Sequence, residues 1–434
     1  MMTASPTATE LSRTRPALRD GVLDPVDALA ELAPIGRDEA RGGWSRHLLD
    51  DADQKMREWF FQTAISLGLR FERDANANQW AVWAPPGASG KAVGTGSHLD
   101  SVPGGGPLDG PLGVVSSLAA VSRLIAEGHR PAHPIRVANF AEEEGARFGV
   151  PCLGSQLLCG ELAPERVRAL TDATGTSCAH VLEAGGYEPS VIGADPSRLA
   201  DLAMYVELHV EQGCQLAPLD APVGLATGIL AHGRWLLTIT GRGDHAGATE
   251  LESRHDPMLV AATAIQAART HALLADPATK GRATVGKLQV VPGGSNAIAS
   301  EVRLWLDARA ERDEDVRALV ARIVAEMETS ADSEGCEMAL TEESFSTRVT
   351  FDAALTARIG AALRPTLGDV PRIPTGAGHD AGILAAYLPT AMLFVRNPDG
   401  VSHSPLEGAT DDDIRAGVAA LTDTLRALTS PEVA

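Results

Sequence analysis

An apolar run near position 140 breaks off into three acidic residues, in the stretch Ile135-Arg136-Val137-Ala138-Asn139-Phe140-Ala141-Glu142-Glu143-Glu144-Gly145. Residues 134–140 have the length and composition of a buried β-strand, and the acids follow where that strand should end. Two further strand-like runs, residues 92–96 and 202–208, are each followed within two residues by a histidine, His98 and His209. Ligands of an open α/β sheet bind beyond the carboxyl ends of the strands, so we expect these side chains to lie close together.

Strands alternate with helices on both sides of this run. Apolar residues at helical spacing, such as Met56, Trp59 and Phe60, predict amphipathic helices, and short apolar runs predict strands. The predicted helices are residues 27–32, 52–67, 112–126, 353–363 and 412–428, and the predicted strands are residues 79–84, 92–96, 134–140, 202–208 and 390–395. This alternation predicts an α/β fold with a mostly parallel sheet flanked by helices.

Residues 235–340 show a different order of elements. The pattern predicts strands at residues 235–241, 283–291 and 301–308 and helices at residues 257–272 and 314–330. This is the β-α-β-β-α-β order of a ferredoxin-like α+β domain, with the last strand the weakest in the pattern. Because the segment lies between His209 and His403, both of which we assign to one site, we expect it to be inserted into the first domain. The predicted domains are residues 1–223 with 343–434, and residues 224–342.

Composition restricts the function classes. The chain has 434 residues, too many for one hydrophobic core, and its net charge of −20 argues against nucleic acid or an anionic membrane as a partner. Its five cysteines include no Cys-x-x-Cys pair and indicate no disulfide framework. Residues 1 to about 22 are expected to be a flexible or surface-hugging leader; they are polar and lack the apolar core of a secretory signal, so we expect a cytoplasmic protein.

The first candidate metal ligands surround a glycine-rich turn. His98 is followed by Asp100, whose carboxylate could orient the imidazole as partners of metal ligands commonly do. Asp109 lies in the glycine-rich segment of residues 104–110, where each carboxylate oxygen could bind one metal ion. Taken singly, a histidine after a strand is more often structural, and Asp-Gly is a common turn pair. A dinucleotide-binding loop is disfavoured because His98 and Asp109 occupy that edge of the sheet.

The second group of candidates follows the other two strands. Glu143 and Glu144 are adjacent, so in a loop one can bind metal while the other transfers protons. An acidic cluster is usually a solvated face, but this one interrupts an apolar neighbourhood. Alternation would place Glu207, His209 and Glu211 on one face, where buried polar groups are costly unless they are paired or bind a metal.

Seven motifs in this order resemble one known family. They are His98-x-Asp100, Asp109-Gly110, Glu143-Glu144-Gly145, Glu207-Leu208-His209-x-Glu211-Gln212-Gly213, His245-Ala246-Gly247, Gly376-Ala377-Gly378-His379-Asp380-Ala381 and Ser402-His403-Ser404-Pro405. The set is similar to the carbamoylase and allantoate amidohydrolase branch of the dinuclear-metal aminoacylase–carboxypeptidase superfamily, from about residue 25 to the C-terminus. That branch includes N-carbamoyl-L-amino acid hydrolases, allantoate amidohydrolases and beta-ureidopropionases.

The resemblance implies a role for each matching position. Two divalent metal ions per subunit (Zn, Mn, Co or Ni) would activate water, and Glu143 would be the general base and acid beside Asp100. The implied metal ligands are His98 and His209 for one ion, Glu144 and His403 for the other, and Asp109 as the bridge. His245 on the inserted lid and dimerisation domain would stabilise the oxyanion, acting across a homodimer. The implied substrate-binding residues are Gln212, Asn296, Arg309 and His379.

The resemblance also implies the reaction, a metal-dependent hydrolysis of a linear ureido or amide C–N bond in a small substrate that bears a carboxylate. Arg309 would bind that carboxylate; without the resemblance, a surface ion pair with the neighbouring Asp307 or Glu311 is the preferred explanation of this arginine. The substrate would be an N-carbamoyl-L-amino acid or allantoate; the alternative is an aminoacylase or dipeptidase of the same superfamily. A non-catalytic binding protein is disfavoured because no ligand position and no base is missing.

Overall fold

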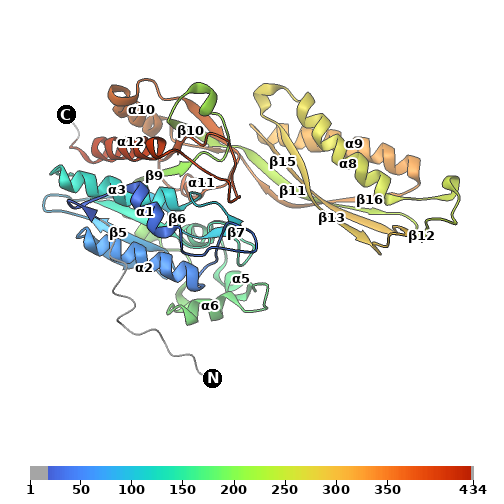
Figure 1. Cartoon of the computed structure of the whole chain (residues 1–434), viewed down its shortest axis with the longest axis horizontal. Coiled ribbons are helices and arrows are strands. Elements are labelled where there is room, and N and C mark those ends of the chain that lie inside the picture. The colour runs from blue at the N-terminus through green and yellow to red at the C-terminus, as the bar shows by residue number, and fades with distance from the viewer. Residues whose placement is uncertain (1–17, 432–434) are drawn as a thin grey trace. The chain divides into compact units, whose positions relative to one another are not determined.

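The computed structural model describes residues 18–431, which form two compact units. The first unit consists of the residues up to Thr227 and those from Thr350 on, and the second is Gly228–Val349 (Figure 1). The chain therefore leaves the first unit, builds the second, and returns. Each unit has its own hydrophobic core.

The first unit is built on a nine-stranded sheet. Across the sheet its strands are β17 (Val349–Thr350), β10 (Val223–Ile229), β19 (Thr390–Val395), β9 (Leu202–Val210), β6 (Ala92–His98), β8 (Ile135–Phe140), β5 (Gln79–Trp83) and β4 (Arg70–Arg73), with β18 (Arg372–Thr375) paired to β10. The four central strands β19, β9, β6 and β8 run parallel, and the pairs β10–β19, β8–β5 and β5–β4 are antiparallel. The carboxyl ends of the four parallel strands consequently share one edge, as the sequence predicts.

A buried helix packs against the central strands of this sheet and begins at the edge where their carboxyl ends lie. Helix α3 (Pro111–Ala126) begins directly after Gly110, whose φ of 88° is accessible to glycine at little cost, and Pro111 occupies its first turn. The helix is apolar on almost all sides because it packs on β6, β8 and β9 and is covered by α1 (Pro25–Leu32) and α12 (Asp411–Thr429). Among the described residues, no helix is long and apolar enough to cross a membrane.

The remaining elements of the first unit are shorter or peripheral. The longer helices are α1 (Pro25–Leu32), α2 (Asp51–Ser66), α10 (Ala353–Leu367) and α12 (Asp411–Thr429). Short helices α4 (Leu153–Cys159), α5 (Pro164–Ala169), α6 (Cys178–Ala184) and α7 (Pro196–Ala200) lie between β8 and β9, and α11 (Asp380–Leu384) precedes β19. Two short strand pairs are β1 (Leu18–Arg19) with β2 (Val22–Leu23), and β3 (Trp44–Arg46) with β7 (Ser101–Gly105).

The second unit is an antiparallel sheet with two helices. Its elements in chain order are β11 (Ala231–Thr240), α8 (Pro257–Leu274), β13 (Arg282–Val291), β15 (Glu301–Ala310), α9 (Asp313–Glu334) and β16 (Glu337–Ser346), with a small pair β12 (Asp244–His245) and β14 (Ala297–Ile298). The sheet order β13-β15-β11-β16 is that of a ferredoxin-like fold. Alternate residues of β11 and β15 are buried against α8 and α9, so the predicted β-α-β-β-α-β order is confirmed, including its last strand.

Several sequence-based expectations need correction. The predicted leader, residues 1 to about 22, lies outside the described residues up to position 17, and its end is ordered as the strands β1 and β2. Strand β9 ends at Val210, so Glu211 does not share a strand face with His209. Instead Glu211 accepts the backbone N–H groups of Gln215 and Leu216 and shapes the turn after the strand. Helices α4 to α7 carry too little periodicity to be predicted.

Gly96 is required where β6 passes β8. Its φ is 138°, and a Cβ at this position would lie 2.1 Å from the carbonyl oxygen of Ala138, its partner in the strand ladder. We expect Gly96→Ala to destabilise the first unit by about 2–4 kcal/mol, through steric overlap and backbone strain. Chemical denaturation would measure this change, with Gly286→Ala as the control because no atom lies within 4 Å of a Cβ there. Equal midpoints for both variants would contradict the prediction.

Candidate metal centre

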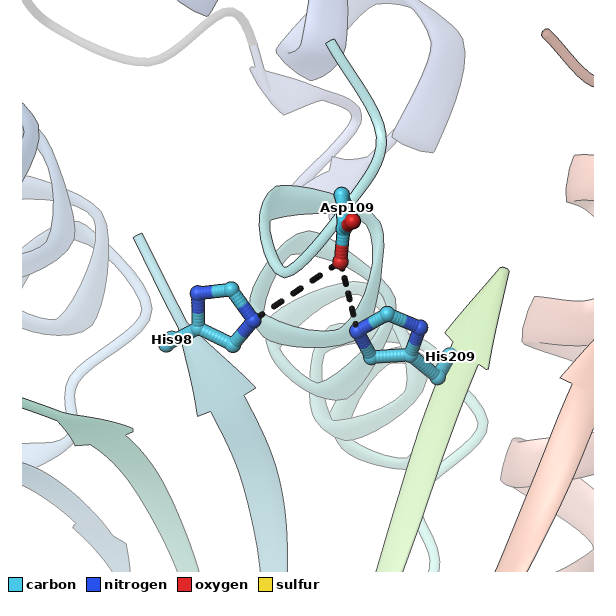
Figure 2. Close-up of side chains that lie close together, drawn as sticks. All are labelled: His98, Asp109 and His209. Atoms are coloured by element: carbon cyan, nitrogen blue, oxygen red, sulfur yellow. Dashed lines mark ion pairs between the residues drawn. The ribbon is translucent and has the colours of Figure 1, made fainter. Parts of the chain in front are cut away.

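Two histidines from adjacent parallel strands face one aspartate (Figure 2). The Nε2 atom of His209 lies 3.3 Å from Oδ1 of Asp109, and Nε2 of His98 lies 4.0 Å from the same oxygen. His98 ends β6, His209 is the penultimate residue of β9, and Asp109 precedes α3. All three side chains are buried, and their potential ligand atoms lie within 4.8 Å of one another.

Backbone carbonyls turn both imidazoles toward Asp109. Nδ1 of His98 lies 3.1 Å from the carbonyl oxygen of Asp100, and Nδ1 of His209 lies 3.0 Å from that of Val210. When Nδ1 carries the proton for these contacts, Nε2 of each ring presents a lone pair to the centre of the cluster. Nε2 of His209 is buried and has no hydrogen-bond partner in the described part of the chain. A bound cation would satisfy it.

The second cluster uses the other oxygen of the same aspartate. Oδ2 of Asp109 lies 3.2 Å from Nε2 of His403, which in turn lies 3.4 Å from Oε2 of Glu144. Asp109 therefore belongs to both clusters, with one oxygen directed to each. The side chain of His403 is half exposed, so this cluster is open to solvent, whereas the first is enclosed.

The donor atoms fit a divalent transition metal. Each cluster combines imidazole nitrogen with carboxylate oxygen, a ligand set that suits Zn, Mn, Co or Ni. Several carboxylates in and around the clusters are buried, and a buried negative charge is costly unless a cation compensates it. The unpartnered lone pair of His209 supports the same conclusion.

Of the three consecutive acids after β8, Glu142 and Glu143 are buried and Glu144 is partly buried, and each has separate contacts. Glu142 has a φ of 54° and its Oε1 accepts the backbone N–H groups of Arg147 and Phe148. Oε2 of Glu143 lies 3.6 Å from Nε2 of His98, and Glu144 belongs to the second cluster. The alternative of a solvated acidic face is therefore wrong.

The carboxylate of Asp100 binds the backbone of Glu143 and Glu144 rather than the imidazole of His98. Its carboxylate accepts the backbone N–H of Glu143 at 3.2 Å and that of Glu144 at 3.0 Å. The same carboxylate is 3.6 Å from Nδ1 of His98, which is beyond hydrogen-bond distance, and the backbone carbonyl of Asp100 makes that contact instead. The predicted proximity of Asp100 to His98 is thus observed, but its carboxylate serves the acidic loop.

Burial and neighbouring charges shift the titration of this centre in opposite directions. Burial raises the pKa of Glu143 well above its usual value and that of Glu144 to about 7. The hydrogen bond to Asp109 raises the pKa of His403 to about 9. Burial opposes the ionisation of Asp109, yet the hydrogen bond from His403 and the other imidazoles lower its pKa. Asp109 is thus anionic over the whole neutral range.

These shifts predict that the cation-free protein loses stability as the pH rises. Glu142 and Glu144, with pKa values of about 8 and 7, keep protons that the unfolded chain releases near 4.5, so their ionisation in the folded state costs stability. The stability from His403, present below 6.5, is lost as the pH rises through about 9. The lowered pKa values of His209 and His379 act in the opposite sense, but only below 6.5.

We therefore expect the melting temperature of chelator-treated protein to fall between pH 6.5 and 9. Added Zn or Mn should make this fall shallower, because a cation compensates the ionised carboxylates. Thermal melts at fixed ionic strength, with and without metal, would test this. A melting temperature that rises over this pH range in the chelated protein would contradict it.

The predicted substrate residues are divided between the two units. In the first unit, Gln212 donates from Nε2 to Oδ2 of Asp109 at 2.9 Å, and the buried ring of His379 lies 4.5 Å from that of His209. In the second unit, His245 on β12 is exposed, and the backbone carbonyl of Asn296 accepts the N–H of Ala246. The first unit thus brings together every predicted metal ligand together with Asp100, Glu143, Gln212 and His379.

Arg309 forms the ion pair that its sequence neighbours suggest. Its Nε and Nη2 bind the two carboxylate oxygens of Asp307 at 2.8 and 3.0 Å, along one face of β15. The guanidinium therefore already makes a two-point contact with a carboxylate.

Two contacts of the centre were missed by the sequence analysis. Sγ of Cys152, just before α4, lies 3.3 Å from Oε1 of Glu143. Oε2 of Glu407 accepts the backbone N–H of Asp109. Only the sequence closeness of Glu407 to His403 pointed toward this site.

Comparisons with known proteins show the family of this chain. The family model described as peptidase family M20/M25/M40 matches residues 94–427. An N-carbamoyl-L-amino acid amidohydrolase of Geobacillus stearothermophilus is 34% identical over 410 residues, 93% of this chain and 98% of the relative. The chain belongs to the M20/M25/M40 family.

Within the M20 family the chain falls in the hydantoinase/carbamoylase branch. An allantoate amidohydrolase of Bacillus subtilis is 27% identical over 96% of this chain and 99% of its own length. The crystal structure of an amidase of the hydantoinase/carbamoylase family from Burkholderia vietnamiensis superposes with a TM-score of 0.81 at 31% identity, covering 94% of this chain and 97% of that one. This M20 protein is therefore a hydrolase of the carbamoylase and allantoate amidohydrolase family, with the mixed α/β fold of its relatives.

Proposed function

We propose that this protein hydrolyses a linear C–N bond of a small ureido acid, either an N-carbamoyl-L-amino acid or allantoate. The observation that carries the proposal is that Asp109 joins two clusters of imidazole and carboxylate groups, with Glu143 beside them. The substrate classes are those named for the relatives from Geobacillus and Bacillus.

The proposed chemistry assigns proton transfer to Glu143. A ureido carbon is a poor electrophile because two nitrogens donate electron density into it. Two bound divalent cations would supply Lewis acidity to the carbonyl and make water nucleophilic near neutral pH. The positive charge of the bound cations would offset the burial that raises the pKa of Glu143, so that its carboxylate could take the proton from the attacking water and return it to the leaving nitrogen. The two backbone hydrogen bonds to Asp100 hold the acidic loop for this task.

Substrate binding is assigned to Gln212, Asn296, Arg309 and His379, and oxyanion stabilisation to His245. Arg309 is paired with Asp307 through two contacts in this structure, so it would have to exchange that partner in order to bind a substrate carboxylate, which offers the same pair of oxygens. His245, Asn296 and Arg309 belong to the second unit, and the two clusters belong to the first.

The proposed activity is tested by metal removal and return. Purified protein is treated with a chelator, reloaded with Zn, Mn, Co or Ni, and assayed for ammonia release from N-carbamoyl-L-amino acids and from allantoate. We expect metal-dependent release from one of these two classes. Absence of release from any ureido acid would refute the proposal, and faster cleavage of dipeptides or N-acyl amino acids would support an aminoacylase or dipeptidase.

We also propose that the protein is a homodimer formed through the second unit. Helix α8 exposes apolar side chains at Met258, Leu259, Ile265 and Leu273, and the neighbouring β13 is an edge strand of its sheet. An exposed edge strand beside an apolar helix face is suited to pairing with a second copy. Light scattering after size-exclusion chromatography should give the dimer mass, and an active monomer would contradict the proposal.

A further inference from the structure

Glu407, a buried residue outside the predicted ligand set, accepts hydrogen bonds from the backbone at Asp109. Oε2 of Glu407 accepts the N–H groups of both Leu108 and Asp109 at 3.0 Å, across almost 300 residues of sequence. The Glu407 side chain is almost fully buried. Two hydrogen bonds donated by adjacent backbone amides to one buried carboxylate oxygen fix the local direction of the chain.

The loop that carries Asp109 is wedged between Glu407 and His98. A Cβ at Gly106 would lie 2.2 Å from Oε2 of Glu407, and a Cβ at Gly110 would lie 2.4 Å from the ring of His98. Glycine at both positions lets the backbone approach these two side chains directly. The carboxylate of Glu407 therefore packs directly against the backbone of this loop at Gly106.

The segment that contains Glu407 also supplies direct contacts to the Asp109 side chain. Oγ of Ser402 donates to Oδ2 of Asp109 at 3.2 Å, and Nε2 of His403 lies 3.2 Å from the same oxygen. Residues 402–407 thus hold both the backbone and the carboxylate of Asp109. Because these residues form neither helix nor strand, no ladder of hydrogen bonds otherwise sets the position of His403 relative to Asp109.

We propose that Glu407 is a positioning residue that fixes the Asp109 loop against the His403 segment and thereby sets the cation affinity of the cluster formed by Asp109, Glu144 and His403. This inference rests on the proposed function only in assuming that the two clusters bind cations. His98 and His209 lie on neighbouring parallel strands, whose ladder keeps them in place without Glu407. The cluster containing His403 should therefore respond much more strongly to loss of Glu407.

The test measures cation binding rather than activity. Chelator-treated wild type, Glu407→Ala and Glu407→Gln are titrated with Zn alone in competition with a chromogenic chelator. We expect two ions in the wild type, and in Glu407→Ala a loss of affinity for one of them of about 10–100-fold, the range for partners of metal ligands. Glu407→Gln keeps an oxygen acceptor for both amides and should restore binding to within about threefold of the wild type.

A matched control separates positioning from general stability. One oxygen of the buried Asp74 accepts two backbone N–H groups, those of Asn76 and Asn78, at 3.0 and 2.9 Å, and Asp74 belongs to neither cluster. Asp74→Ala should lower the melting temperature as Glu407→Ala does, while leaving both Zn affinities unchanged.

Two results would overturn the inference. One is a Glu407→Ala protein that binds both Zn ions as tightly as the wild type. The other is an unchanged affinity in Gly106→Ala, whose methyl group would displace the same carboxylate and which serves if Glu407→Ala does not fold. A wild type that binds no Zn would instead refute the proposed function, so the two failures are distinguishable.

Discussion

Replacing Glu143 with glutamine is expected to lower kcat by about 10²–10⁴-fold, the contribution of a positioned acid–base group. Glutamine has nearly the same shape as glutamate, so the acidic loop held by Asp100 should stay in place. It cannot accept the proton of water, however, and the step that generates the nucleophile slows. Steady-state kinetics on the best ureido substrate, with Zn titration in parallel, would measure the effect.

The adjacent glutamate offers a matched control for this substitution. Burial raises the pKa of Glu142 to about 8, so its side chain is largely protonated at neutral pH and glutamine mimics that state. Its Oε1 accepts the N–H groups of Arg147 and Phe148, a role that an amide oxygen can keep. We therefore expect Glu142→Gln to retain most activity. Equal losses in the two variants would show that the Glu143 effect is structural.

Asp109→Asn is expected to remove one of the two cations and to lower kcat/KM by on the order of 10³-fold, since Lewis acid catalysis contributes several kcal/mol. Gln212 and Ser402 both donate to Oδ2 of Asp109, so the amide oxygen should take that place. The amide nitrogen would then face Nε2 of His209, where Oδ1 is now 3.3 Å away. It would donate to the lone pair that the cation needs.

Metal analysis after gel filtration distinguishes this outcome from simple unfolding. Asp74→Asn, the same substitution at a buried acid outside both clusters, should keep two ions per chain and near wild-type activity. An Asp109→Asn protein that keeps both ions would show that Asp109 does not join two cation sites. That result would remove the principal support for the proposed dinuclear centre.

The strand ends were predictable because buried strands have a strong local signal. Residues 390–395 were predicted as a strand and form β19, and the predicted strand at residues 134–140 differs from β8 by one residue. Parallel strands place their carboxyl ends at one edge, so the approach of His98, Glu144 and His209 could be inferred from strand positions alone. Among the short helices between β8 and β9, α5 and α7 lack such a signal because few of their residues are buried. Helices α4 and α6 are better buried but span only seven residues each, too few to show a helical period.

The detailed contacts of the centre were not predictable. Asp100 was expected to orient His98 with its carboxylate, but it holds the backbone of Glu143 and Glu144 instead. The adjacent acids were open to interpretation as a solvated face, but Glu142 and Glu143 are buried and Glu144 is partly buried. The hydrogen bond from the backbone N–H of Asp109 to the carboxylate of Glu407 joins segments almost 300 residues apart. No local sequence pattern predicts a contact over such a separation.

The amino-acid sequence by itself determined the two kinds of sheet, the order of their elements and the approach of His98, Glu143, Glu144 and His209 at one sheet edge. These features follow from apolar periodicity and from the geometry of parallel strands, both of which act over short stretches of chain. Only the tertiary structure decided which atom of each side chain faces the centre. The backbone carbonyls that contact His98 and His209 lie only one or two residues away, but they orient the rings in a defined way only within the folded strand ends. Burial and the shared carboxylate of Asp109 arise when distant segments meet.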